Sequence, residues 1–273
     1  MRMDFTTSEA GATEEIAAVE AQWTRIWQEA GGPQGLADRI PRKEEYRVIA
    51  PWIDRLPRGA RMLDGGCGLG DWTLHFTRRG FPTLGLDISR ATIDVLQRKF
   101  PDAEFAVGDI RATGLPDASF DAYFSWGTFE HFQEGLGGCV REAFRVLKPG
   151  GMLFVSVPFD NLRHGLRAVL LDRYKLEPLS APRRFYQWRL TRAELADALA
   201  SQGFAVEDVR IIGKRQGLQR ALQHNLGLSP TGLPAKAAAT LLAPLVPATL
   251  VGHMILAAAR KPAAAVPGLS APR

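Results

Sequence analysis

The stretch MLDGGCGLGDW at residues 62–72 decides the fold of this chain. A short apolar run ends at Asp64, and Gly66, Gly68 and Gly70 then form a turn ahead of a predicted helix. Glycine adopts positive φ without strain and, lacking a Cβ atom, lets the backbone approach a ligand. The free N–H groups of the following helix attract an anionic group. The stretch therefore predicts a nucleotide-binding loop between a strand and a helix.

Short apolar runs and helical segments alternate after this loop. We expect strands at residues 61–63, 82–86, 103–107, 122–125 and 152–157, with helices at 71–80, 89–99 and 135–147 between them. Such alternation predicts right-handed crossovers and a parallel sheet with helices on both faces. A helix at 191–202, opened by the capping box of Thr191 and Glu194, and strands at 205–211 and 253–259 complete a doubly wound α/β domain.

The segments outside this core, apart from the C-terminal tail, are expected to be helical. Residues 12–30 and 43–55 carry apolar side chains at helical spacing, and Pro51 is expected to bend or interrupt the second helix. We expect an N-terminal helical cap at 1–40, a main domain at 41–262 and a disordered tail at 263–273. Inserts at 159–190 and 214–250 are expected to form a lid over the site.

The composition fits a folded globular protein of the cytoplasm. Of the 273 residues, 46% are hydrophobic and 23% are charged, so the chain can bury a full core. Cys67 and Cys139 are the only cysteines, without the spacing of a metal site or a disulfide framework. The N-terminus lacks the apolar segment of a secretory signal. We therefore expect a cytoplasmic protein without a metal centre, whose oligomeric state the sequence leaves open.

Two further acidic residues end predicted strands. Asp87 ends the strand in LGLDIS, and Asp109 ends the strand in FAVGDI. One carboxylate can bind both hydroxyls of a ribose, and a second suits the amino group of adenine. Each acid alone could instead cap a helix or be a surface charge, since Asp87 precedes a predicted helix start at Ser89. Their common place at strand carboxyl ends, where open α/β sheets bind ligands, favours the binding interpretation.

These motifs resemble those of the class I S-adenosylmethionine-dependent methyltransferases over residues 40–212 and the last strand. The resemblance implies a Rossmann-like sheet of seven strands, mostly parallel with an antiparallel last strand, and S-adenosylmethionine as cofactor. It also implies residues for each part of the cofactor. These are Asp64, Gly65, Gly66, Gly68 and Gly70 for the methionine moiety, Asp87 and Ile88 for the ribose, Asp109 and Ile110 for the adenine, and Ser125 and Trp126 for the sulfonium.

A nicotinamide-dependent oxidoreductase is the competing class for this loop, because it would share the glycine-rich turn and Asp87. Its turn has the pattern GxGxxG, whereas Gly70 here is followed by Asp71. The sequence also lacks a Tyr-x-x-x-Lys pair for hydride transfer. The loop spacing therefore favours S-adenosylmethionine.

Glu130 and His131 in GTFEHF are the candidate catalytic residues, since they follow the fourth predicted strand. His131 could accept a proton from a hydroxyl or amine, and Glu130 could orient it or bind a cationic acceptor. Both could instead cap the next helix or hydrogen-bond the loop. FEHF also resembles the cyclopropane fatty acid synthases, in which such residues hold bicarbonate, although GLDIS departs from that group's pattern.

The acceptor is expected to contact the inserts, near Arg163, Arg167 and Tyr186. Trp23, Trp27 and Tyr46 are expected to close the site from the N-terminal side. The alternative roles of these residues are surface ion pairs and core packing. No Asp or Glu follows Asp208, and residues 237–259 carry no charge. This charge-free stretch is expected to be a hydrophobic lid, with peripheral membrane contact or a membrane span as alternatives.

The sequence thus predicts an enzyme that moves a methyl group from S-adenosylmethionine to an O or N atom of a small-molecule or lipid-linked acceptor. The amino-methylating NPPY-type motif is absent, and aromatic residues do not alternate with the basic clusters, so no nucleic-acid substrate is expected. The alternatives are a cyclopropane-synthase-like lipid methyltransferase and a non-catalytic S-adenosylmethionine-binding module.

Overall fold

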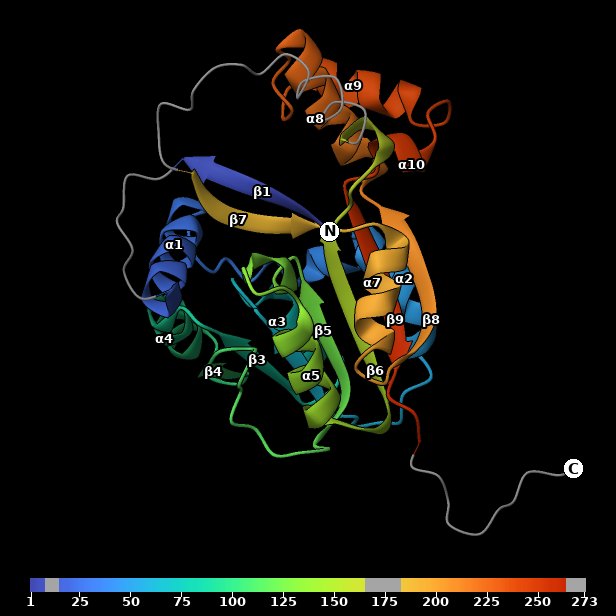
Figure 1. Cartoon of the computed structure of the whole chain (residues 1–273). Helices are drawn as coiled ribbons and strands as arrows, with labels where there is room; N and C mark the ends of the chain where they lie inside the picture. Colours follow the sequence, from blue (N-terminus) through green and yellow to red (C-terminus); the bar gives the residue numbers. More distant parts are fainter. Residues whose placement is uncertain (8–14, 165–182, 264–273) are drawn as a thin grey trace, which may run out of the picture.

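The computed structural model describes residues 1–7, 15–164 and 183–263 of the chain (Figure 1). Within these residues a seven-stranded sheet has the order β4-β3-β2-β5-β6-β9-β8. Its strands are β2 Met62–Gly65, β3 Thr83–Asp87, β4 Glu104–Val107, β5 Phe120–Trp126, β6 Leu147–Pro158, β8 Ala205–Ile212 and β9 Met254–Arg260. β9 runs antiparallel to both neighbours, β6 and β8, and the other pairings are parallel. The predicted doubly wound sheet with an antiparallel last strand is confirmed.

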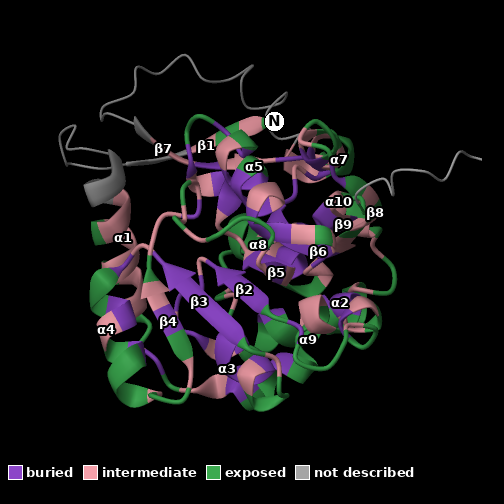
Figure 2. Ribbon diagram, turned by 90° about the horizontal axis from the view of Figure 1, so that it is seen from below, coloured by how far each residue is buried: buried purple, intermediate pink, exposed green. Residues whose placement is uncertain are grey.

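Helices cover both faces of this sheet, because successive side chains of a strand point to opposite faces. Phe124 of β5 packs in one core with α2 (Glu44–Ile53) and α3 (Asp71–Arg78), and the adjacent Tyr123 packs in another with α5 (Gly137–Val146) and α7 (Arg192–Ala200). A smaller cluster joins α4 (Arg90–Lys99) to Phe105 of β4. Figure 2 shows the central strands as the buried layer.

The predicted helices of the domain agree with the structure to within a few residues. The capping box at Thr191 is present, with both reciprocal hydrogen bonds to Glu194 formed. The interruption expected at Pro51 is not seen, since α2 continues through it to Ile53. Pro51 falls in the last turn of the helix, so its missing N–H costs a single backbone hydrogen bond.

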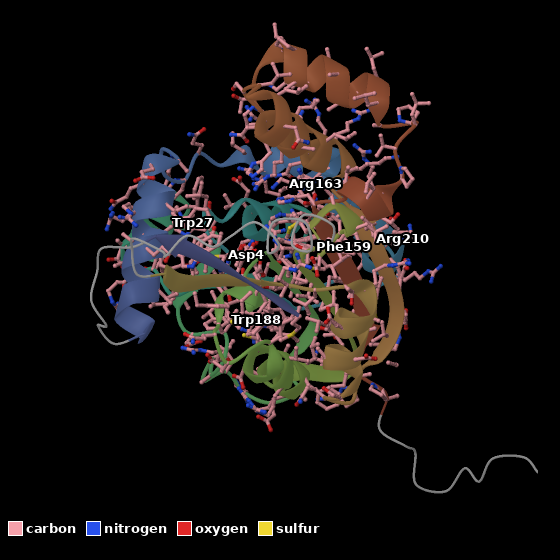
Figure 3. All side chains as sticks on the ribbon, turned by 45° about the horizontal axis from the view of Figure 1, so that its top comes forward. Asp4, Trp27, Phe159, Arg163, Trp188 and Arg210 are labelled. Carbon is pink, nitrogen blue, oxygen red and sulfur yellow. The ribbon has the colours of Figure 1, made fainter. Side chains whose placement is uncertain are left out.

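The N-terminal segment corrects the expectation of a wholly helical cap. Helix α1 (Glu15–Glu29) and the 3₁₀ helix η1 (Leu36–Arg42) are present, but the chain begins with a strand, β1 (Arg2–Thr7). β1 pairs antiparallel with β7 (Arg183–Arg189) in a separate two-stranded sheet. Asp4 of β1, marked in Figure 3, accepts hydrogen bonds from Gln187 Nε2 at 2.9 Å and Arg189 Nε at 2.6 Å.

The insert expected at 214–250 forms three helices, α8 (Lys214–Leu226), α9 (Leu233–Leu242) and α10 (Ala248–Val251). We call residues 214–251 the helical lobe. β8 and β6 are both antiparallel to β9 and hence parallel to each other, so the helical lobe follows the carboxyl end of β8. It therefore rises from the sheet edge at which the other parallel strands also end (Figure 1).

Residues 237–259 do not form the continuous span that the sequence left open. They comprise the end of α9, α10 and most of β9. Across residues 1–7, 15–164 and 183–263, no helix combines the length and apolar character needed to cross a bilayer. Arg167 and the predicted tail from residue 264 onward lie outside the described residues.

Candidate active site

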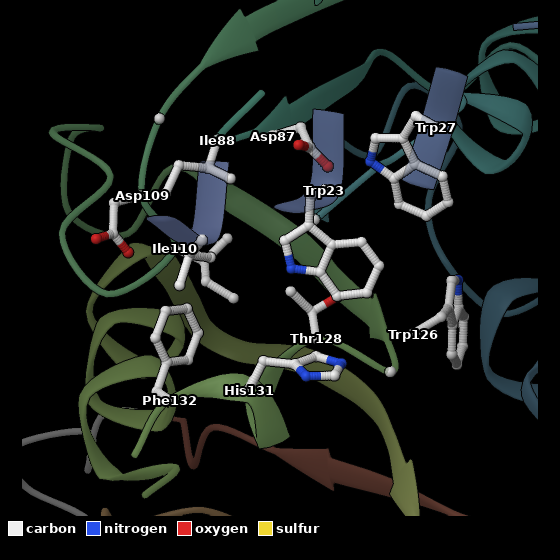
Figure 4. A pocket seen from close by; sticks show the side chains of 14 residues that line it. Trp23, Trp27, Asp87, Ile88, Asp109, Ile110, Trp126, Thr128, His131 and Phe132 are labelled. Carbon is white, nitrogen blue, oxygen red and sulfur yellow. The ribbon is translucent and has the colours of Figure 1, made fainter. Parts of the chain in front are cut away.

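A cleft lies at the carboxyl ends of the parallel strands, beneath helix α1 (Figure 4). The strand ends and the loops that follow them supply most of its walls, and α1 supplies the remainder. The lining residues are Gly66, Asp87, Ile88, Gly108, Asp109, Ile110, Trp126, Gly127, Thr128, His131 and Phe132, with Val19, Trp23 and Trp27 from α1. The sequence predicts a ligand at this edge of the sheet, and the cleft lies at the same edge.

The glycine-rich loop forms the floor of the cleft. The backbone N–H groups of Gly66 and Cys67 donate to the Leu86 carbonyl at 2.8 and 2.9 Å, which fixes the loop against β3. Gly66 has φ +77°, and a Cβ atom there would lie 2.5 Å from Thr128 Oγ1. Any side chain at this position would therefore be strained and would also collide with the loop after β5.

Asp64 lies below the loop and does not line the cleft. Its Oδ2 accepts hydrogen bonds from Thr73 N at 3.1 Å and Thr73 Oγ1 at 2.7 Å, and the side chain is buried. Burial raises the pKa of Asp64 to about 7. The carboxyl group thus connects the loop to helix α3 and positions the backbone that a ligand would contact.

Asp87 lines the cleft and holds the loop as well. Its Oδ2 accepts from Gly68 N and its Oδ1 from Ser89 N, both at 2.9 Å. Burial raises its pKa. The capping of α4 is carried out by Ser89, whose Oγ accepts from Thr92 N. Asp87 is therefore free of the helix-capping role that was its alternative interpretation, and its remaining lone pairs can accept from ligand hydroxyls.

Asp109 lines the far end of the cleft in an ion pair with Arg111. Arg111 Nη2 lies 2.8 Å from Asp109 Oδ2, and the same guanidinium binds Glu134 at 2.6 Å. The guanidinium stacks 4.3 Å above the ring of Phe132, which also lines the cleft. Both oxygens of Asp109 accept from Arg111, Oδ1 from N at 2.8 Å and Oδ2 from Nη2 at 2.8 Å. Ile88, Ile110 and Phe132 give this end apolar walls beside that ion pair.

Of the remaining predicted cofactor residues, some line the cleft and others support the glycine-rich loop from behind. Trp126 lines the cleft and packs against Trp72, with ring centroids 4.7 Å apart and the ring planes tilted by 34°. Ser125 is buried and donates to the Gly65 carbonyl at 2.6 Å, so it supports the loop from β5. Gly65 leaves no room for a side chain, because a Cβ atom there would lie 2.2 Å from Tyr123 Oη.

Several lining residues were not predicted as ligand contacts. Thr128 and Phe132 belong to the GTFEHF segment, which also holds the predicted catalytic residues Glu130 and His131. Their position in this segment could have identified them as lining residues. Gly108 precedes Asp109. Val19 comes from α1, which is far away in sequence. Trp23 and Trp27 of the same helix were expected to close the site from the N-terminal side, and both line the cleft.

The shape and polar groups of the cleft fit S-adenosylmethionine. It offers a close-approach backbone at Gly66, carboxylates at two neighbouring strand ends and an apolar end. The buried indole N–H groups of Trp27 and Trp126 have no acceptor among the described residues, and both rings line the cleft. Buried donors of this kind are normally satisfied, so a polar ligand in the cleft would complete them.

A second, smaller pocket adjoins the cleft. It is lined by Val19, Gln22, Trp23, His131, Gln133, Phe185 and Tyr186, and it shares Val19, Trp23 and His131 with the cleft. The rings of Trp23 and His131 meet edge to face with centroids 4.9 Å apart, as Figure 4 shows from the cleft side. These two side chains form the boundary between the two spaces.

His131 is held in one tautomer at this boundary. Its Nδ1 lies 2.8 Å from the carbonyl oxygen of Tyr186, which can only accept, so Nδ1 carries the proton. Nε2 of the neutral ring is then an acceptor. Burial lowers the pKa of His131, which keeps the ring neutral.

Glu130 is buried beside His131. Burial raises its pKa to about 8, and its Oε2 has no hydrogen-bond partner among the described residues. At neutral pH the carboxyl is therefore protonated, and neither member of the pair carries a charge.

The four predicted acceptor residues are dispersed. Tyr186 lines the second pocket. Tyr46 lines neither pocket; its ring packs 5.1 Å from that of His75, and its hydroxyl accepts from Arg79 Nη1 at 2.6 Å. Arg163 lies beside His164, with Nη2 3.5 Å from Nε2, and lines neither pocket. Arg167 is outside the described residues.

Comparisons with known proteins agree with this geometry. A family model described as a methyltransferase domain matches residues 63–155. A probable S-adenosylmethionine-dependent methyltransferase of Mycolicibacterium smegmatis is 30% identical over 177 residues, which is 64% of this chain and 63% of that protein. This chain thus spans less than two thirds of that relative. A ubiquinone biosynthesis O-methyltransferase of Alkalilimnicola ehrlichii is 31% identical over 64% of this chain and 70% of its own length.

The fold is also similar to that of solved methyltransferase structures. The Burkholderia thailandensis 1,6-didemethyltoxoflavin-N1-methyltransferase, solved with S-adenosylhomocysteine, superposes with a TM-score of 0.57 over 94% of this chain and 95% of that one. Its 16% identity supports the fold alone. With the sequence relatives, these findings show that the chain belongs to the class I S-adenosylmethionine-dependent methyltransferases. The cofactor of the family is S-adenosylmethionine, as the sequence predicted.

Proposed function

We propose that this protein transfers a methyl group from S-adenosylmethionine in the cleft to an O or N atom of an acceptor in the second pocket. The observation that carries the proposal is the shared boundary of the two spaces at Trp23 and His131. A donor and an acceptor on opposite sides of this boundary would meet there, and alignment of this kind supplies much of the acceleration of a displacement reaction.

The cofactor supplies an activated methyl group, and the protein residues supply alignment, a dry environment and a base. Bound S-adenosylmethionine would supply a methyl group activated by its sulfonium, which would take the electron pair of the broken carbon–sulfur bond as the acceptor atom bonds to the methyl carbon. His131 Nε2, unprotonated in the observed tautomer, takes the proton from the acceptor O–H or N–H. The neutral Glu130 beside it adds no negative charge that would hold the ring in its protonated form.

The acceptor is proposed to be a small molecule or a lipid-linked one. The second pocket combines the amides of Gln22 and Gln133 with the rings of Phe185 and Tyr186, which suits a cyclic compound with hydroxyl or amino groups. The Alkalilimnicola relative is named as an O-methyltransferase of ubiquinone biosynthesis, which supports a hydroxyl acceptor. A cytoplasmic location and the lack of a nucleic-acid substrate stay predictions, and peripheral membrane contact is considered below.

Calorimetry with S-adenosylmethionine and S-adenosylhomocysteine tests the cofactor site first. We expect both to bind the wild type and Asp102→Asn, an exposed acid outside the cleft, and to bind Asp87→Asn at least about tenfold more weakly. Equal affinity in all three proteins would exclude Asp87 from the site.

Turnover is tested next, by screening hydroxylated and amino-substituted acceptors with methyl-labelled cofactor. We expect transfer by the wild type, and transfer slowed by about 10²–10⁴ in His131→Asn with cofactor affinity kept. Cofactor binding without transfer to any acceptor would instead favour a non-catalytic binding module.

A further inference from the structure

The helical lobe exposes a row of leucines that its own fold does not use. The four most exposed large apolar side chains among the described residues are Leu226, Leu233, Leu241 and Leu245, at 67%, 82%, 75% and 79% exposure, and all four lie in the helical lobe. Large exposed apolar side chains that cluster in this way mark contact surfaces. Scattered single leucines on a surface would need no such explanation.

The spacing places three of these leucines along one line. Leu233, Ala237 and Leu241 follow one another at intervals of four on α9, and Leu245 comes four residues later, in the turn after the helix. Residues four apart share a face of a helix. We call Leu233, Ala237, Leu241 and Leu245 the leucine stripe.

The opposite face of α9 forms the core of the helical lobe. Ala235 and Ala239 are fully buried, and Ala239 packs with Leu218 of α8 and Val251 of α10. The leucine stripe therefore points away from the neighbouring helices, and Figure 1 shows α9 as the outermost element of the helical lobe. Removing the exposed leucines would leave this internal packing intact.

The charged side chains that the helical lobe itself carries have one sign. The helical lobe contains Lys214, Arg215, Arg220 and Lys236, and no Asp or Glu occurs anywhere after Asp208. Arg215, Arg220 and Lys236 are exposed. An apolar stripe with basic flanks is the pattern of helices that lie in the interface of an anionic bilayer.

We infer that the helical lobe docks the protein on an anionic lipid bilayer, with the leucine stripe inserted among the headgroups and the basic residues bound to phosphates. Residues 214–251 contain no Trp, Tyr, Phe or Met, the side chains that dominate protein–protein contacts, where leucine is under-represented among the residues that carry binding energy. A bilayer is therefore favoured over a protein partner.

This placement also turns the cleft toward the bilayer. The helical lobe follows the carboxyl end of β8, at the same edge of the sheet as the cleft. A lipid-linked acceptor would thus approach from the side on which the second pocket lies. The docking itself does not depend on the proposed methyl transfer and can be measured without it.

Vesicle cosedimentation with the full-length chain tests the inference. We expect binding to phosphatidylcholine vesicles that contain phosphatidylglycerol, weaker binding to pure phosphatidylcholine, and loss of binding as salt screens the basic residues. The triple variant Leu233→Ser, Leu241→Ser and Leu245→Ser should lower the partition coefficient at least about tenfold, since burial of three leucines contributes well over the ~1.4 kcal/mol that a factor of ten requires.

Leu162→Ser is the matched control, because Leu162 is 60% exposed but lies outside the helical lobe. It should bind vesicles like the wild type, and circular dichroism should show that both leucine variants are folded. The double variant Arg215→Glu and Lys236→Glu should lose the preference for phosphatidylglycerol. Equal binding of the wild type and the triple variant would overturn the inference. The inference would also be overturned if the wild type did not bind vesicles but formed a dimer in analytical ultracentrifugation, and the triple variant did not form it. The stripe would then be the contact with a second copy of the chain.

Discussion

Nε2 of His131 lies 3.9 Å from Oε1 of Glu130, and the two side chains are only 8% and 2% exposed. A histidine and a carboxylate so close would normally form an ion pair, but burial moves their pKa values in the directions that keep both neutral. The pair is therefore a neutral acid beside a neutral base, at the boundary between the cleft and the second pocket. Protonation of His131 should change the activity, and ionisation of Glu130 should change the free energy of unfolding.

Replacement of His131 should separate chemistry from cofactor binding. His131→Asn removes the proposed proton acceptor, and we expect kcat to fall by about 10²–10⁴, the usual contribution of a general base. The affinity for S-adenosylhomocysteine should change little in calorimetry. A loss of cofactor affinity as large as the loss of kcat would assign His131 a structural role.

The pH dependence of kcat should report the same residue. The pKa of His131 lies below its ordinary value of 6.5, and the active form is the unprotonated ring. Activity should therefore be lost as pH falls, with a midpoint below 6.5. The residual activity of His131→Asn should lack this limb. An identical acid limb in the variant would identify another group as the base.

Glu130 should make the protein less stable as pH rises. Its folded pKa of about 8 exceeds the ordinary value of 4.5, so its contribution is fully present below pH 4.5 and is lost as pH rises to about 8. Glu130→Gln keeps the neutral shape without the ionisation. Urea unfolding should thus show the stability of the variant rising relative to the wild type between pH 5 and pH 8, by at most about 5 kcal/mol. A pH-independent difference would contradict the raised pKa.

Gly66→Ala should damage both stability and cofactor binding, whereas Gly59→Ala should damage stability alone. Both glycines have φ near +75°, at +77° and +74°, so each alanine carries a similar backbone strain of about 1–2 kcal/mol. A Cβ atom at Gly59 meets nothing within 4 Å, while one at Gly66 would lie 2.5 Å from Thr128 Oγ1. Melting temperatures and calorimetry on both variants measure the difference. Equal effects would mean that the close approach at Gly66 is unimportant.

Asp4→Ala should destabilise the protein through Arg189. Asp4 Oδ2 lies 2.6 Å from Arg189 Nε, and the arginine side chain is only 12% exposed, so the variant leaves a mostly buried cation without this partner. We expect a loss of about 1–3 kcal/mol in the free energy of unfolding. Asp38→Ala, which breaks the exposed pair with Arg78, is the control and should cost less than about 1 kcal/mol. Similar losses in the two variants would show that β1 is not held by this contact.

Local sequence determined the central sheet and the floor of the cleft. The loop MLDGGCGLGDW and the acids of LGLDIS and FAVGDI lie within residues 62–110, next to the strands that carry them. Parallel strands joined by short crossovers bring their carboxyl ends to one edge, so their order in the chain was sufficient to place Asp87 and Asp109 together. The positive φ of Gly66, Gly68 and Gly70 is likewise a local property.

Tertiary structure decided which side chains close the site and where the acceptor side lies. Asp4 meets Gln187 and Arg189 across more than 180 positions, and short strands such as β1 are identified by their partner rather than by their own six residues. Trp23 reaches His131 because α1 docks over the cleft, and Tyr46 lies away from it because η1 and α2 pack against α3. Contacts between segments far apart in sequence depend on how well their buried surfaces pack together, and this packing cannot be read from a local sequence pattern.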